Sequence, residues 1–452
     1  MRFSRENATA SRAGVGLVWW PELDPLCRPG EGLVHVIEAE PETFWVPRDM
    51  KSSGFMSRLP AKLEHLPQPK LLHCVGAPFG GGAMQTASHR EVLAGDIAAL
   101  QPAWISDHLS FNQFVVSGAN GADQVVSTGF FLPPAQCRRG VEIAAEQIRR
   151  RRVTTGVPVA FEVPVSYLPR RPGEMPDGAF AAEVAAAADC GILLDLHNLL
   201  CNERNGRQSV AEFCNSIPLE RVWEIHLAGG EAAGGFWVDA HCGLVEPALM
   251  EILASIVPQL PALRAIIFEI IPDYIASVGL ASIGKMLGEL NELWLTHASE
   301  GGQALARSDA TKPAELADTI TPGMWELALG AAVTEIAIPE LPAEFAEWVR
   351  SADIPLGLYR TYSRETRASS LVDTAPRTIR TLLRRRGEAR TRALLADFWR
   401  QAPPAYSIIE DAWTFLDFVC GADLTIPGLE EDITSDRAFL VQTIRMPDHH
   451  SG

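Results

Sequence analysis

Long apolar runs are missing from this sequence. No stretch reaches the roughly 18 uninterrupted apolar residues that a membrane-spanning helix needs, although hydrophobic residues make up 47% of the 452 residues. The segment Met1–Ala13 is polar, unlike the apolar centre of a secretory signal peptide. We therefore expect a folded protein that acts in the cytoplasm, with no membrane as its partner.

Positive charge is scarce. The 39 Lys and Arg residues stand against 56 Asp and Glu residues, which gives a formal net charge of −17. Such a molecule repels phosphate backbones, so nucleic acid is not expected as a partner. One basic segment, residues 377–392, carries seven arginines. It is either the solvated face of a helix or a surface that meets an acidic peptide.

Two kinds of binding motif are also missing. The eight cysteines include no CxxC pair, which argues against a structural zinc site and against a disulfide framework. The first apolar run is not followed by GxGxxG, and Gly80-Gly81-Gly82 is not followed by the Lys-Ser/Thr of a phosphate loop. Neither a dinucleotide site nor a phosphate loop is predicted.

Short runs rich in Val, Ile and Leu recur up to residue 270. We expect strands at Gly14–Trp20, Val34–Glu40, Lys70–Gly76, Ala103–His108, Val157–Val163, Gly191–Leu196, Val222–Leu227 and Ala265–Ile270. Candidate helices between them are Ser88–Leu100, Gly140–Arg151, Phe180–Asp189, Val210–Asn215 and Pro247–Ile256. Eight such units predict a closed (β/α)₈ TIM barrel over residues 1–296, with an open doubly wound sheet as the alternative.

A different pattern follows the barrel region. Residues 297–322 are rich in Ala, Gly, Ser and Thr and predict a linker. Apolar residues then recur at three- and four-residue spacing, which predicts a small all-helical domain over residues 323–452. Its expected helices are Trp325–Ile336, Ala343–Arg350, Ser370–Arg386, Ala389–Trp399 and Ile408–Cys420.

Histidines and carboxylates stand where the predicted strands end. Along the chain they are Glu38, Glu40, Glu42, His73, Asp107, His108, Glu162, Asp195, His197, Asn198, Glu224, His226, Asp239, His241 and Glu269. The predicted sixth strand continues as far as Asn198. Asp239 and His241 lie in the loop after the seventh strand. In a TIM barrel these side chains converge at the C-terminal mouth, where active sites lie.

This set of side chains predicts a metal site. Several carboxylates packed together would repel one another, whereas cations would neutralise them. Mixed His, Asp, Glu and Asn ligation without thiolate suits iron, manganese or zinc. Because the candidates outnumber what one ion can use, we expect at least two metal ions and a catalytic rather than a structural role.

The motifs resemble those of the multinuclear non-haem iron-dependent oxidases. The resemblance covers roughly residues 14–295 and rests on these segments: Gly14–Leu17, His73–Gly76, Ser106–Leu109, Glu162–Tyr167, Leu194–Asn198, Glu224–Gly229, Asp239–His241 and Phe268–Glu269. It implies a TIM barrel that binds two or three irons, mixed-valent Fe(II)/Fe(III), and uses O₂ as co-substrate. It also implies a ribosomally synthesised precursor peptide as substrate, modified commonly at cysteine, often with a partner protein that holds the precursor.

The resemblance assigns metal ligands residue by residue. It places His73, Asp107, His108, Glu162, His226, Asp239, His241 and Glu269 at ligand positions, with Asp195, His197 and Asn198 as further candidates. This chain departs from the family pattern in three places. His197-Asn198 replaces two adjacent asparagines, Asp107 replaces a glutamate, and no Asn follows Glu162. These differences are typical of a divergent subgroup.

The predicted helical domain then has two interpretations. It is a precursor-binding partner fused to the oxidase, with Trp399, Pro403, Pro404 and Tyr406 on its docking surface, or an appendage that stabilises or dimerises the chain. Two other functions remain open for the whole protein. One is a redox-neutral divalent-metal barrel of the sugar isomerase or endonuclease IV type, and the other is a non-catalytic peptide-binding or metal-binding protein.

Overall fold

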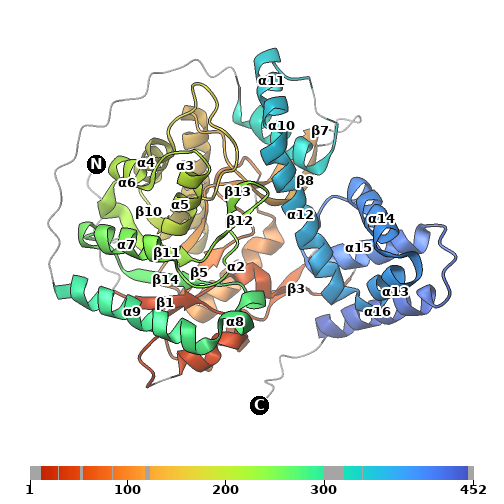
Figure 1. Cartoon of the computed structure of the whole chain (residues 1–452), viewed down its shortest axis with the longest axis horizontal. Helices are drawn as coiled ribbons and strands as arrows, with labels where there is room; N and C mark the ends of the chain where they lie inside the picture. The colour runs from red at the N-terminus through yellow and green to blue at the C-terminus, as the bar shows by residue number, and fades with distance from the viewer. Residues whose placement is uncertain are drawn as a thin grey trace.

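The computed structural model describes residues 12–28, 30–50, 54–83, 85–117, 123–299, 320–337 and 340–445. A barrel of strands surrounded by helices occupies one side of the molecule, and the helices of the last third of the chain lie on the other (Figure 1). Within the described part of the chain, no helix has the length and apolar character to cross a membrane.

Eight parallel strands close into a barrel. They are β1 (Gly14–Val18), β2 (Val36–Ala39), β5 (Lys70–Cys74), β6 (Ile105–His108), β9 (Val159–Glu162), β10 (Gly191–Asp195), β11 (Val222–Ala228) and β14 (Ala265–Glu269). Their order around the barrel is β1-β14-β11-β10-β9-β6-β5-β2, with β2 returning to β1. The predicted TIM barrel is confirmed, and an open sheet is excluded.

The strands are buried on both faces, which is why they read as continuous apolar runs. Inside the barrel, Trp104, Trp223, Ile267 and smaller side chains form a packed plug. Outside, the strands pack against the surrounding helices in the largest apolar core of the molecule. The plug fills the barrel interior, so the polar strand ends are left to form the mouth.

The barrel helices are α1 (Leu59–Leu63), α2 (Ala87–Leu100), α3 (Arg138–Thr155), α4 (Asp177–Ala188), α5 (Leu196–Arg204), α6 (Val210–Ser216), α7 (Pro247–Ile256), α8 (Pro272–Val278) and α9 (Leu280–Ser299). One strand prediction is wrong here, because the sixth strand does not continue to Asn198. The strand ends at Asp195, whose side chain accepts a hydrogen bond of 2.8 Å from the Asn198 N–H and caps α5.

Three two-stranded ribbons were not predicted. They are β3 (Trp45–Pro47) with β4 (Phe55–Ser57), β7 (Phe111–Ser117) with β8 (Asp123–Leu132), and β12 (Glu231–Ala233) with β13 (Phe236–Val238). All are insertions between a barrel strand and the next barrel helix. The longest, β7–β8, follows the metal-candidate strand β6 directly and connects the mouth to the helical region.

The last third of the chain is helical, as predicted. Its helices are α10 (Pro322–Thr334), α11 (Ala343–Ser351), α12 (Asp353–Thr374), α13 (Pro376–Arg386), α14 (Glu388–Gln401), α15 (Ile408–Gly421) and α16 (Leu429–Arg445). The single helix expected over Ser370–Arg386 is wrong. It is divided at Ala375, because Pro376 disfavours helical geometry in the residue before it. Helix α16 was not predicted.

Two apolar cores hold the helical region. Helices α10, α11 and α12 share one core with the β7–β8 ribbon and with loops of the barrel mouth. Helices α12 to α16 enclose a second core, which Val46 of β3 joins from the barrel side. The predicted linker is described only at its ends, where α9 extends to Ser299 and α10 begins at Pro322. The division at residues 297–322 stays a prediction, and His449 and His450 lie outside the described residues.

Candidate metal centre

The polar strand ends meet at the barrel mouth because neighbouring strands bring them into register. His108 on β6 is the register partner of Glu162 on β9. Asp195 on β10 is the partner of His226 on β11. Residues separated by more than 30 positions in sequence are therefore adjacent in space, and three groups of His and carboxylate side chains result.

The first group consists of His73, His108 and Glu162. The Nε2 atom of His73 lies 3.2 Å from Oε2 of Glu162, and Nε2 of His108 lies 3.7 Å from the same oxygen. On the other side of its ring, His73 Nδ1 lies 2.8 Å from the hydroxyl of Ser106. This contact fixes the ring so that Nε2 faces Glu162.

The second group consists of Asp195, His226 and Glu269. The Nδ1 atom of His226 lies 3.0 Å from Oε1 of Glu269 and 4.0 Å from Oε2 of Glu162. Because Glu162 also belongs to the first group, its carboxylate lies between the two. The two groups form one continuous cluster of ligand atoms, as expected for a centre with more than one ion.

The third group lies deeper in the barrel and contains two residues that were not among the predicted ligands, Glu38 and Glu224. Oε2 of Glu38 lies 2.7 Å from Nε2 of His226. The indole N–H of Trp104 donates to Glu224 at 2.7 Å. Both carboxylates are fully buried. Glu224 and His226 are two residues apart on one strand, so both side chains lie on the inner face of the barrel. This spacing indicates from the sequence that Glu224 belongs near His226.

The open side of the cluster lies at Asp239, His241 and His197. Nε2 of His241 lies 2.7 Å from Oδ1 of Asp239 and 3.2 Å from Oε2 of Glu269. Nε2 of His197 lies 3.7 Å from Oδ1 of Asp239. The side chains of Asp239 and His241 are 26% and 25% exposed, whereas His226 and His197 are fully buried. The cluster is therefore open to solvent on this side.

Two predicted ligands have other polar contacts. The carboxylate of Asp107 lies 3.3 Å from Nη2 of Arg151 on α3 and accepts a hydrogen bond of 2.8 Å from the His108 N–H. Asp107 is thus outside the three groups. Asn198, in the first turn of α5, donates from Nδ2 to Glu162 at 2.5 Å. Its side chain reaches the cluster and orients the central carboxylate.

Burial and mutual repulsion shift the pKa values of the cluster. Burial raises the pKa of Glu162 well above its ordinary value, and burial with the neighbouring Glu224 raises that of Glu38 to about 8. Burial also opposes the ionisation of Glu269, but His226 and His241 outweigh it and hold the pKa of that carboxyl below its usual range. The cluster therefore requires compensating positive charge.

The lack of hydrogen-bond partners in the cluster is a second reason why these residues fit a metal ion. Among the described residues, many cluster atoms are buried without a hydrogen-bond partner: Nδ1 of His226, Nε2 of His241, Oδ1 of Asp239, Oδ2 of Asp195 and Oδ1 of Asn198. Several of these atoms approach one another closely, yet not in hydrogen-bonding geometry. Buried ligand atoms that converge outside hydrogen-bonding geometry are expected where a cation belongs.

Aromatic side chains surround the mouth. The ring of Phe131 on β8 stacks on His108 with centroids 4.3 Å apart. The hydroxyl of Tyr167 accepts a hydrogen bond of 3.2 Å from the Asp239 N–H, and the Tyr167 N–H donates to the hydroxyl of Tyr359 at 3.1 Å. Tyr359 belongs to α12, so the helical region supports the loop that carries Asp239 and His241.

The barrel region of the chain is similar in sequence to known proteins. Residues 14–274, more than half of the chain, match the family described as RiPP precursor modification enzyme MbnB/TglH/ChrH. A UPF0276 protein of Anaeromyxobacter sp. (strain Fw109-5) is 30% identical over 236 residues, covering 51% of this chain and 80% of its own length. A UPF0276 protein of Streptomyces avermitilis is 26% identical over 252 residues, covering 55% of this chain and 49% of its own.

Among solved structures, D-psicose 3-epimerase in the presence of D-fructose aligns at 11% identity with a TM-score of 0.37, covering 65% of this chain and all of that chain. The D-allulose 3-epimerase from Methylomonas sp. aligns at 12% identity with a TM-score of 0.38, covering 64% of this chain and 99% of that chain. Neither likeness is close enough to bear on activity. The family match does identify the chain, which belongs to the MbnB/TglH/ChrH family of RiPP precursor modification enzymes.

Proposed function

We propose that this protein is an iron- and O₂-dependent oxidase that modifies a ribosomally synthesised precursor peptide, at a cysteine of that peptide. The observation that supports this proposal is the continuous cluster in which Glu162 lies between two groups of ligand atoms. A single ion would not use so many converging donors, and their hard and borderline chemistry suits iron.

Each group has a separate task in this proposal. His73, His108 and Glu162 would hold one ion, and Asp195, His226 and Glu269 would hold a second. Asp239 and His241 would hold a third or complete the second, on the exposed side. When bound, the irons supply the electrons and the open coordination positions for O₂ and the substrate thiolate.

The deep carboxylates position the ligands rather than bind metal. Glu38 faces Nε2 of His226 at 2.7 Å, which leaves Nδ1 of the same ring directed at Glu269. A carboxylate behind a ligating imidazole fixes the ring and raises its basicity. Glu224 is held in turn by Trp104. The barrel plug below them keeps water out of this side of the cluster.

The helical region would bind the precursor. A cavity of about 270 Å³ lies between the β7–β8 ribbon, α10, α12 and the segment after α14, and Trp399, Pro403 and Pro404 line it together with Arg364. Three of the four residues expected on a docking surface therefore share one cavity. Tyr406 lies elsewhere, stacked on His89 of the barrel helix α2 with ring centroids 3.8 Å apart. It attaches the helical region to the barrel.

The first experiment measures metal content and Mössbauer or EPR spectra on anaerobically purified protein. We expect two or three irons per chain, lost in a variant that carries His226→Ala and His241→Ala. A variant with His35→Ala and His65→Ala removes two histidines outside the cluster and should retain its iron. Zinc, manganese or an absence of metal would contradict the iron oxidase.

A second experiment separates the remaining functions. The loaded protein is incubated with a cysteine-containing precursor, with and without O₂, and the peptide mass is measured. A mass change that requires O₂ is expected. Turnover of a sugar without O₂ would support the redox-neutral barrel instead, and binding of the peptide with its mass unchanged would support a non-catalytic binding protein.

A further inference from the structure

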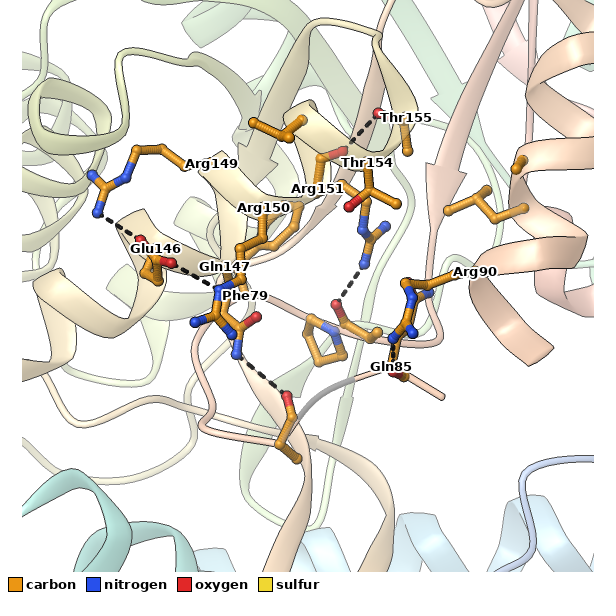
Figure 2. A pocket seen from close by; sticks show the side chains of 16 residues that line it. Phe79, Gln85, Arg90, Glu146, Gln147, Arg149, Arg150, Arg151, Thr154 and Thr155 are labelled. Atoms are coloured by element: carbon orange, nitrogen blue, oxygen red, sulfur yellow. Dashed lines mark hydrogen bonds and ion pairs between the residues drawn. The ribbon is translucent and has the colours of Figure 1, made fainter. Parts of the chain in front are cut away.

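A second cavity lies on the flank of the barrel, between helices α2 and α3. Its volume is about 550 Å³, within the range of small-molecule sites. Figure 2 shows the side chains of the two helices and of the loop after β5 around it. The metal cluster does not line this cavity, so the proposed oxidase chemistry leaves it without a role.

The charge of this flank cavity is opposite to that of the molecule. Of the described residues that line it, four are arginines, Arg90, Arg149, Arg150 and Arg151, and Glu146 is the one carboxylate. Glu146 is shared, because Arg150 Nε donates to it at 2.7 Å and Arg149 Nη2 at 3.2 Å. In a chain with a formal charge of −17, these four guanidinium groups outnumber the two carboxylates that they contact, Glu146 and Asp107.

Arg151 gives the flank cavity a buried cation. The residue is only 7% exposed, and its Nη2 atom donates to the Ala77 carbonyl at 2.9 Å. Its Nη1 atom is buried and has no hydrogen-bond partner among the described residues. A buried N–H without a partner costs free energy, which an added acceptor recovers. The guanidinium also lies over the ring of Phe79, 5.3 Å from its centroid.

The remaining walls suit an organic molecule rather than a simple ion. Val153 offers exposed apolar surface, and the nearly buried Phe79 and Leu93 lie in the wall of the cavity. Gln147 and Thr154 add neutral polar groups on α3, the helix that carries three of the four arginines. Guanidinium groups bind carboxylates and phosphates through paired N–H donors, and apolar walls accept the carbon frame that carries them.

We propose that the cavity between α2 and α3 binds a small organic polyanion, a molecule that carries two or more carboxylate or phosphate groups. The anionic groups contact Arg90, Arg150 and Arg151, and the carbon frame lies against Val153. The ligand is connected to the barrel mouth through one residue, since Arg151 also bonds Asp107, which precedes His108. The site is independent of the proposed oxidase reaction.

The test is calorimetric titration of the iron-loaded protein at low ionic strength with tricarballylate and with fructose 1,6-bisphosphate. Both probes are polyanions that chelate iron weakly, and iron content is measured before and after. A variant with Arg90→Gln and Arg150→Gln removes two cavity cations. The matched control, Arg138→Gln with Arg139→Gln, removes two exposed arginines from the first turn of the same helix.

We expect one-to-one binding of at least one probe, weakened about tenfold or more in the cavity variant and by less than about twofold in the control. Failure of both probes to bind the native chain would overturn the proposal. So would an equal loss in both variants, because it would reveal unspecific attraction. Binding of a glutamate-rich hexapeptide with neither small probe would assign the cavity to a peptide instead.

Discussion

A buried glutamate couples the helical region to the barrel and makes the stability of the chain depend on pH. Glu326 of α10 is 6% exposed, and its two oxygens accept the Gly82 N–H at 3.1 and 3.2 Å. Gly82 lies in the loop that follows the metal-candidate strand β5. Burial raises the pKa of Glu326 from 4.5 to about 7, although the hydrogen bond from Gly82 lowers it.

The sign follows from comparing the folded and unfolded chains. Below pH 4.5 the carboxyl is protonated in both, so its full contribution to stability is present. Between pH 4.5 and about 7 the unfolded chain releases a proton that the folded chain keeps, and stability falls as the pH rises. At about 1.4 kcal/mol for each pKa unit, the loss reaches about 3 kcal/mol above pH 7.

Glu326→Gln keeps an oxygen that accepts the Gly82 N–H but removes the ionisation. We expect this variant to match the native chain near pH 4.5 and to be more stable by about 3 kcal/mol at pH 8. Urea unfolding at both pH values measures the difference. Glu344→Gln, at an exposed position of α11, is the control and should change neither value. If Glu326→Gln showed the same pH dependence as the native chain, the reasoning would be refuted.

Three further predictions concern packing, a buried ion pair and the metal. Gly76→Ala would place a methyl group against the Tyr406 hydroxyl and the Glu42 side chain and should lower the free energy of urea unfolding by about 1–3 kcal/mol; adding Tyr406→Phe should recover part of this loss, because Glu42 still lies within 3 Å of the methyl group. Arg207→Ala should lower the free energy of unfolding by about 3–5 kcal/mol, because it leaves the buried carboxylates of Glu174 and Asp177 without their guanidinium partner. A smaller loss would mean that water reaches these carboxylates. Removing iron by chelation should lower the melting temperature, by the equivalent of about 2.7 kcal/mol if free iron had stood 100-fold above its Kd. A His226→Ala and His241→Ala variant should show no such shift.

The alternation of side chains along strands could also have predicted which strand-end residues face away from the barrel mouth. Cys74 and Asp107 are register partners on adjacent strands, one residue away from the inward-facing His73 and His108. The same alternation that directs Cys74 outward directs Asp107 outward, to Arg151 on α3. Glu224 was already among the strand-end residues, and its place two residues before His226 directs it inward as well.

The sequence by itself determined the barrel and predicted the candidate metal ligands at its mouth. Strands buried on both faces need continuous apolar runs, and a metal cluster needs ligand residues at strand ends; both leave local patterns. Only the tertiary structure decided that Glu162 stands between two ligand groups and that Asp195 ends its strand by capping α5. It alone decided that Tyr406 and Glu326 reach the barrel and that arginines gather beside α2. These contacts join residues far apart in sequence, and their geometry comes from packing, which no local pattern records.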